Sequence, residues 1–119
     1  MCGIVGYKGN QNSIPVLLNG LKSLEYRGYD SAGLAYINGG KVTIKKAIGR
    51  VKNLENLITN DDFGNIGIAH TRWATHGGVT NENAHPHKQG KITLVHNGII
   101  ENYKDLSEKV DTKLLSETD

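Results

Sequence analysis

The pattern of apolar and polar residues near the N-terminus predicts a strand followed by a helix. Residues 3–7 form a short, mostly apolar run with glycines at positions 3 and 6, which indicates a short buried strand. Ser13 stands where a helix N-cap is expected, and Pro15 is tolerated in the first helical turn. The apolar positions that then fall on one helical face are Ile14, Leu17, Leu18, Leu21 and Leu24. We therefore expect an amphipathic helix here.

A β-hairpin and four shorter elements are expected after this helix. Residues 32–37 and 41–48 have strand character and are joined through Asn38-Gly39-Gly40, whose residues tolerate the positive φ of a tight turn. The remaining expected elements are helices over 51–58 and 103–110 and strands over 65–70 and 91–96.

The order of these elements predicts the fold class. Strands outnumber helices, and the two types are mixed rather than strictly alternating, which favours an α+β architecture. Ser116 and Asp119 match the pattern in which a serine and an acid three residues later cap the start of a helix. Because no helix follows this signal within the 119 residues, we expect an incomplete α+β sandwich.

The composition narrows the classes of function. The chain has 119 residues, of which 37% are hydrophobic and 22% charged, as in one modest soluble domain. The 14 Lys and Arg residues outnumber the 12 Asp and Glu residues, which gives a net charge of +2. Because these basic residues are scattered along the chain, we expect no nucleic-acid-binding face. We also expect no membrane span and no signal peptide, because no apolar run reaches about 20 residues and the N-terminus lacks a basic flank. One cysteine forms no internal disulfide, which favours a cytoplasmic location.

Cys2 is the single cysteine and directly follows the initiator methionine. Removal of Met1 would give Cys2 an α-amino group with an ordinary pKa of about 7.7–8.0, so one residue would hold both a nucleophilic sulfur and a base. The alternative is a small buried side chain ahead of a strand. Position alone does not decide between the two interpretations.

Residues 70–78 follow an expected strand and are rich in hydrogen-bonding side chains. The guanidinium of Arg72 suits a carboxylate held by two hydrogen bonds, and Thr75 and His76 are able to position a polar ligand. The alternative is that Arg72 pairs with an internal acid beside a packed Trp73.

All five histidines lie between His70 and His96, which raises the question of a metal site. The closest pair, His85 and His87, is separated by a proline and matches none of the standard zinc spacings. No acidic residue stands at ligand spacing, so we expect no metal centre.

Asn97 and Gly98 follow the last expected strand. A side-chain amide next to an unobstructed backbone N–H supplies the two donors of an oxyanion hole, each of which contributes roughly 2.7–4 kcal/mol to lowering a barrier. An Asn-Gly pair is also a common turn signal, and both interpretations stay open at this point.

Five segments together resemble the N-terminal glutaminase region of the glutamine–fructose-6-phosphate aminotransferase family, which is a class II glutamine amidotransferase with an N-terminal nucleophile. These segments are Met-Cys-Gly-Ile-Val-Gly at 1–6, Leu-Glu-Tyr-Arg-Gly-Tyr-Asp-Ser-Ala-Gly at 24–33, His-Thr-Arg-Trp-Ala-Thr-His-Gly at 70–77, Asn-Ala-His-Pro-His at 83–87 and Val-His-Asn-Gly-Ile-Ile-Glu-Asn at 95–102. They occur in the family's order along the whole chain.

The resemblance implies a role for each candidate residue. Cys2 is expected to be the nucleophile, with its own amine as the base after Met1 is removed. Asn97 and Gly98 would form the oxyanion hole, and Arg27 would support the nucleophile. The residues implied to line the glutamine pocket are Arg72, Trp73, Thr75, His76 and Asp119, with Arg72 and Asp119 on the α-carboxylate and α-amino groups.

The resemblance also implies a reaction and an architecture. L-glutamine is expected to be hydrolysed through a cysteine thioester to glutamate and ammonia, with no cofactor. In the family, the ammonia aminates fructose 6-phosphate in sugar isomerase domains, and the full-length enzyme is expected to be a homo-oligomer. Residues 1–119 would be the N-terminal portion of a glutaminase domain with an α/β/β/α sandwich, and the isomerase domains are absent from this sequence. Alternatives are another class II amidotransferase, such as the glutamine phosphoribosylpyrophosphate amidotransferase, and a non-catalytic glutamine-binding module.

Overall fold

A four-stranded antiparallel sheet forms the centre of the molecule. The structure is a computed structural model that describes residues 2–74, 77–110 and 116. The strands are β1 (Gly3–Lys8), β2 (Ser31–Asn38), β3 (Lys41–Ile48) and β4 (Ile66–Arg72), and their order in the sheet is β1-β4-β2-β3. β4 therefore pairs with both β1 and β2 and joins the N-terminal strand to the hairpin.

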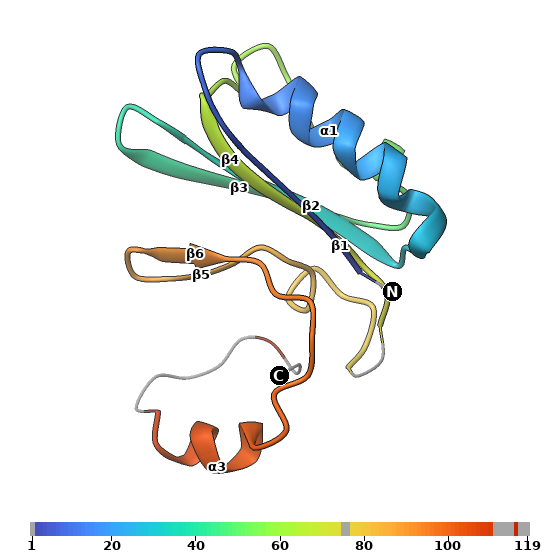
Figure 1. The fold of residues 1–119 in the computed structure, drawn as a ribbon, viewed down its shortest axis with the longest axis vertical. Helices are drawn as coiled ribbons and strands as arrows, with labels where there is room; N and C mark the ends of the chain where they lie inside the picture. The colour runs from blue at the N-terminus through green and yellow to red at the C-terminus, as the bar shows by residue number, and fades with distance from the viewer. Residues whose placement is uncertain (1, 75–76, 111–115, 117–119) are drawn as a thin grey trace.

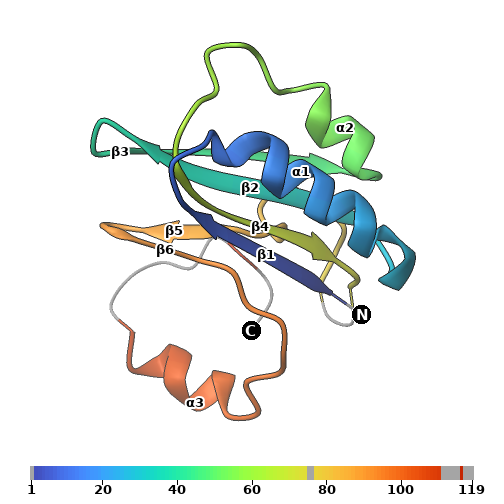
Figure 2. The ribbon, with the colours of Figure 1, turned by 45° about the horizontal axis from the view of Figure 1, so that its top comes forward.

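Two helices cover one face of this sheet, as Figure 2 shows. They are α1 (Ser13–Leu24) and α2 (Val51–Glu55), and a 3-10 turn, η1 (Glu25–Arg27), follows α1. The buried side chains between helices and sheet include Leu17, Leu21, Leu34, Val51, Leu54 and Ala69. Alternate residues of each strand point to this core, because successive side chains of a strand face opposite sides of the sheet.

A second layer lies on the other face of the sheet (Figure 1). Its short hairpin consists of β5 (His87–Gln89) and β6 (Ile92–Leu94), and α3 (Tyr103–Glu108) lies beyond it, on the side away from α1. Gly33 of β2 permits this layer to approach the sheet, since a Cβ built at that position would lie 2.0 Å from the His85 carbonyl oxygen.

The hairpin and the first helix agree with the sequence prediction. β2 pairs with β3 through Asn38 and Lys41, and the turn residues Gly39 and Gly40 have φ angles of +60° and +78°. The predicted N-cap is wrong by one residue, because Ser13 is already helical and buried. The side chain of Asn12 accepts the hydrogen bond from the Ile14 N–H at 3.2 Å instead.

The shorter elements differ more from their predicted bounds. The helix expected over 51–58 ends at Glu55. The residues that follow it form tight turns, in which the Ile58 N–H donates a hydrogen bond to the Glu55 carbonyl. The predicted strand 65–70 extends to Arg72, and the strand expected over 91–96 is limited to 92–94. β5 was not predicted. Of the helix-start pattern at 116–119, only Ser116 lies within the described residues.

None of the helices in the described part of the chain is long and apolar enough to cross a membrane.

Candidate active site

The pairing of β1 with β4 brings Cys2 to Trp73. Gly3 pairs with Thr71 in the antiparallel register, so the residue before β1 and the residue after β4 are neighbours. The backbone N–H of Trp73 donates a hydrogen bond to Cys2 Sγ over 3.4 Å, and the same sulfur lies 3.8 Å from the Trp73 carbonyl oxygen. The backbone of Trp73 therefore holds the Cys2 sulfur at the end of β4, with its N–H as a donor and its carbonyl oxygen as an acceptor for the thiol proton.

Asn97 reaches Cys2 from the second layer of the molecule. Its Nδ2 donates to the Cys2 carbonyl oxygen over 3.2 Å, although the two residues are 95 positions apart in the sequence. Gly98 is the next residue and is exposed. The fold therefore brings the predicted nucleophile and the predicted oxyanion-hole segment together, with Cys2 itself only partly buried.

Arg72 is buried and bonded to other parts of the chain. Its side chain is 5% exposed, and its Nη1 lies 3.5 Å from Asp30 Oδ1. The same nitrogen donates to the Gly78 carbonyl at 2.8 Å. These contacts match the alternative considered for Arg72, in which it pairs with an internal acid. A role in binding a glutamine carboxylate stays a prediction.

Asp30 is the residue that sequence reasoning missed at this site. Besides its ion pair with Arg72, its carboxylate accepts hydrogen bonds from the Ala74 N–H and from the Ser31 hydroxyl, the latter at 2.8 Å. Its own N–H donates to the Arg72 carbonyl at 2.7 Å. Asp30 thus fixes the chain on both sides of Trp73. The sequence signal that could have indicated Asp30 is its position between the Tyr-Arg-Gly segment and the hairpin.

Trp73 and the Tyr-Arg-Gly segment are in contact. The Trp73 indole is 50% exposed, and a Cβ built at Gly28 would lie 2.8 Å from it. Gly28 has a φ of +119°, which favours glycine, so two features restrict this position to a residue without a side chain. Arg27 ends η1 directly before it and is half-buried. The supporting role expected of Arg27 stays a prediction.

Three other predicted site residues, Thr75, His76 and Asp119, lie outside the described residues, and so does Met1. Their assignment to the glutamine pocket and the removal of Met1 therefore stay predictions.

The histidines predicted not to form a metal centre make a buried cluster behind the site. The rings of His70 and His85 stack with centroids 4.1 Å apart, and His87 lies 4.3 Å from His85. Burial lowers the pKa of His70 and of His87 to about 4 and that of His85 to about 3. Within residues 2–74, 77–110 and 116, no group of three His, Cys, Asp or Glu side chains is arranged to hold a metal ion.

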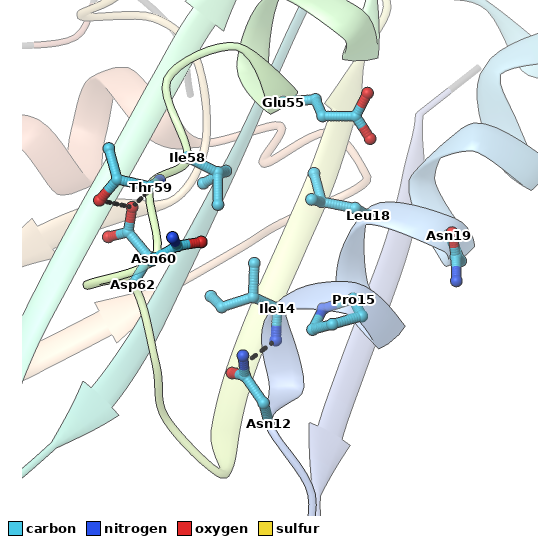
Figure 3. Close-up of a pocket in the computed structure, with 10 residues that line it drawn as sticks. All are labelled: Asn12, Ile14, Pro15, Leu18, Asn19, Glu55, Ile58, Thr59, Asn60 and Asp62. Carbon is cyan, nitrogen blue, oxygen red and sulfur yellow. Dashed lines mark hydrogen bonds between the residues drawn. The ribbon is translucent and has the colours of Figure 1, made fainter.

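Figure 3 shows a pocket whose lining does not include Cys2. It lies beside the start of α1, where β1 has ended, and is lined by Asn12, Ile14, Pro15, Leu18, Asn19, Glu55, Ile58, Thr59, Asn60 and Asp62. Two of its polar groups are engaged internally: Asn12 caps α1, and Asp62 accepts from the Thr59 N–H at 2.8 Å and from the Tyr36 hydroxyl at 2.5 Å. We assign this pocket a structural role.

Comparison with curated proteins finds relatives along the whole chain. The glutamine–fructose-6-phosphate aminotransferase of Listeria innocua is 54% identical over 123 aligned residues, which are 100% of this chain and 20% of the relative. The same enzyme of Clostridium acetobutylicum is 55% identical over 125 residues, 100% of this chain and 21% of the relative. No family model matches. The chain therefore spans about a fifth of the length of these relatives.

Comparison with solved structures identifies the fold. The glutamine phosphoribosylpyrophosphate amidotransferase from Bacillus subtilis, in complex with ADP and GMP, matches 92% of this chain and 24% of its own with a TM-score of 0.77 and 28% identity. The predicted fold class is confirmed: the chain matches part of an N-terminal-nucleophile-hydrolase fold, and its described residues form a helix layer, a four-stranded sheet and a second layer with a two-stranded sheet.

Proposed function

We propose a function from the homology of residues 1–119 to the N-terminal region of the glutamine–fructose-6-phosphate aminotransferases. The chain carries the nucleophile end of a glutaminase site that hydrolyses L-glutamine to glutamate and ammonia. The observation that carries this proposal is a pair of hydrogen bonds: the Trp73 N–H donates to Cys2 Sγ, and the Asn97 side chain donates to the Cys2 carbonyl oxygen.

The proposed reaction begins at the Cys2 sulfur. The neutral α-amino group of Cys2, exposed once Met1 is removed, accepts the thiol proton, and the thiolate attacks the side-chain amide carbon of glutamine. The amide oxygen becomes an oxyanion, which the Asn97 side chain and the Gly98 N–H stabilise. The ammonium form of the Cys2 amine then returns the proton to the leaving nitrogen.

Collapse of this intermediate releases ammonia and leaves a glutamyl thioester on Cys2. A water molecule, deprotonated by the same amine, attacks the thioester carbon, and the C–S bond breaks to give glutamate and the free thiol. All atoms come from glutamine, water and Cys2, so the cycle needs no cofactor.

The remaining pocket residues are proposed from the resemblance. Arg72 binds the glutamine α-carboxylate and Asp119 its α-amino group, while Trp73, Thr75 and His76 line the pocket. Arg27 supports the nucleophile. In a longer protein with sugar isomerase domains, the ammonia would aminate fructose 6-phosphate, and such a protein would form homo-oligomers in the cytoplasm, where Cys2 stays reduced.

The experiment that tests this function measures ammonia and glutamate released from L-glutamine. We expect turnover by the wild-type chain and a fall of at least about 10³-fold in Cys2→Ala, because removal of a catalytic nucleophile leaves only the binding contribution. Cys2→Ser is the conservative variant and should retain the same thermal unfolding midpoint with little turnover.

Two outcomes would contradict the proposal. Turnover that persists in Cys2→Ala would exclude Cys2 as the nucleophile. Glutamine binding by the wild-type chain without release of ammonia would favour the non-catalytic binding module.

A further inference from the structure

The backbone of His96 is held on both sides by imidazole side chains. Nε2 of His70 lies 3.0 Å from the His96 carbonyl oxygen. The His96 N–H donates to Nδ1 of His85 over 3.2 Å. The two rings come from different parts of the fold, since His70 belongs to β4 and His85 precedes β5.

These two hydrogen bonds fix the tautomers of both rings. A carbonyl oxygen only accepts, so Nε2 of His70 carries the proton. A backbone N–H only donates, so Nδ1 of His85 is unprotonated and the neutral ring carries its proton on Nε2. Stacking of the rings, 4.1 Å between centroids and 23° between planes, fixes their relative position.

We call the pair of His70 and His85 rings that hold the His96 backbone the clamp. Its surroundings bury both rings and keep them neutral. His70 is 0% exposed and His85 is 9% exposed. Gly33 lets the His85 carbonyl come against β2, where any larger residue would meet it. Because burial keeps both pKa values near 3 to 4, the acceptor nitrogen of His85 is unprotonated at neutral pH.

The clamped residue directly precedes the proposed oxyanion-hole segment. Asn97 follows His96 and bonds to Cys2, while His70 lies in the strand whose end holds Trp73 against the Cys2 sulfur. We propose that His70 and His85 are positioning residues, which hold the His96 backbone and thereby fix Asn97 and Gly98 beside Cys2. This inference rests on the proposed glutaminase function.

The alternative is that both rings only fill space behind the site, and matched substitutions at His85 separate the two ideas. His85→Leu keeps an apolar side chain of similar size and removes the acceptor. His85→Asn places Oδ1 near the position of Nδ1 and restores an acceptor. His87→Leu is the control, because His87 belongs to the same cluster and lies 4.3 Å from His85, but its ring makes neither of the two bonds to His96.

Two quantities are measured for each variant: the hydrogen-exchange protection of the His96 amide, and kcat and KM for glutamine hydrolysis. We expect His85→Leu to lose at least about tenfold in protection and about tenfold or more in kcat, with KM changed less than about threefold, because a misplaced catalytic group costs rate rather than binding. His85→Asn should recover most of both quantities, and His87→Leu should behave as wild type.

A wild-type measurement covers the case in which His85→Leu does not fold. In ¹⁵N-labelled protein, we expect scalar coupling across the hydrogen bond from the His96 N–H to Nδ1 of His85, and its absence would overturn the clamp. Unchanged kcat in a folded His85→Leu variant would also overturn the proposal. Failure of the glutaminase function is recognised separately, because the wild-type chain itself would then release no ammonia.

Discussion

Cys2 is hydrogen-bonded to Trp73 and Asn97, which come from two distant parts of the sequence. The Trp73 N–H contacts its sulfur, and the Asn97 amide contacts its carbonyl oxygen. The side-chain amide of Asn97 is the kind of donor expected at a developing oxyanion. The chemistry proposed for the site therefore depends on these two contacts.

Asn97→Ala removes the side-chain donor of the proposed oxyanion hole. We expect kcat for glutamine hydrolysis to fall about 10²- to 10³-fold with a smaller change in KM, since the donor acts on charge that develops only in the transition state. Steady-state kinetics measure both constants. A large rise in KM with kcat unchanged would instead assign Asn97 to ground-state binding of glutamine.

At the level of single residues, the sequence predicted candidate site residues but not the partners that they contact in the fold. Cys2 was predicted because its position behind Met1 is chemically distinctive. The pairing of Arg72 with Asp30 could not be predicted, because 42 positions separate the two and only the β2–β4 register brings them together. For the same reason, the histidines were considered as metal ligands, whereas two of them bind the His96 backbone.

Among the elements, β4 determines the geometry of the site. It pairs with β1 on one side and β2 on the other, so its end places Arg72 and Trp73 between the N-terminus and Asp30. Its middle carries His70, which holds the second layer. One strand thus contacts both the proposed nucleophile and the segment that holds the proposed oxyanion hole.

The close approach of the second layer to β2 yields a prediction about Gly33. Gly33→Ala would place a Cβ 2.0 Å from the His85 carbonyl oxygen, a backbone atom that moves only with its whole segment. We expect a loss of about 1–3 kcal/mol in the free energy of unfolding, measured by denaturant titration. Gly6→Ala is the matched control, because nothing lies within 4 Å of a Cβ at that position of β1. Equal stability of the two variants would contradict the predicted packing.

Strong periodicity determined which elements were predicted accurately. The helix at 13–24 has clear apolar spacing, and the hairpin at 31–48 has a two-glycine turn. The bounds of both were predicted to within one or two residues. β5 has only three residues, His-Lys-Gln, and none is apolar. Its pairing with β6 comes from tertiary contacts, which a local pattern does not record.

For the whole molecule, the histidine cluster between the two layers makes the stability of the fold depend on pH. Burial is the largest cause of the lowered pKa values of His70, His85 and His87. The nearby cations also lower them, Lys46 from β3 acting on His85 and His87, and Arg72 from β4 acting on His70 and His87. The folded chain therefore resists protonation at a site that an unfolded chain protonates readily.

The free energy of unfolding should fall as the pH decreases from about 7 to about 4. An unfolded histidine titrates near pH 6.5, so below that value the unfolded chain binds more protons than the folded chain. A single group with a folded pKa of about 4 costs about 2 kcal/mol at pH 5. Urea titrations at several pH values measure this slope, and His87→Leu should make it shallower. Stability that is flat between pH 7 and pH 5 would contradict a neutral buried cluster.

The whole chain is similar in sequence to the curated aminotransferases and in fold to the Bacillus subtilis amidotransferase. It matches the curated aminotransferases over all of its own length and the Bacillus subtilis amidotransferase over 92% of it. The central claim, however, concerns one atom, Cys2 Sγ, as the nucleophile that attacks glutamine.

The most direct test of that claim is the intact mass of the wild-type chain before and after incubation with a glutamine-mimicking electrophile, followed by mapping of the adduct. We predict loss of Met1, one adduct located on Cys2, and slower labelling when L-glutamine is present. A chain that has lost Met1 and remains unlabelled, or that is labelled at a rate glutamine does not change, would contradict a glutamine site at Cys2.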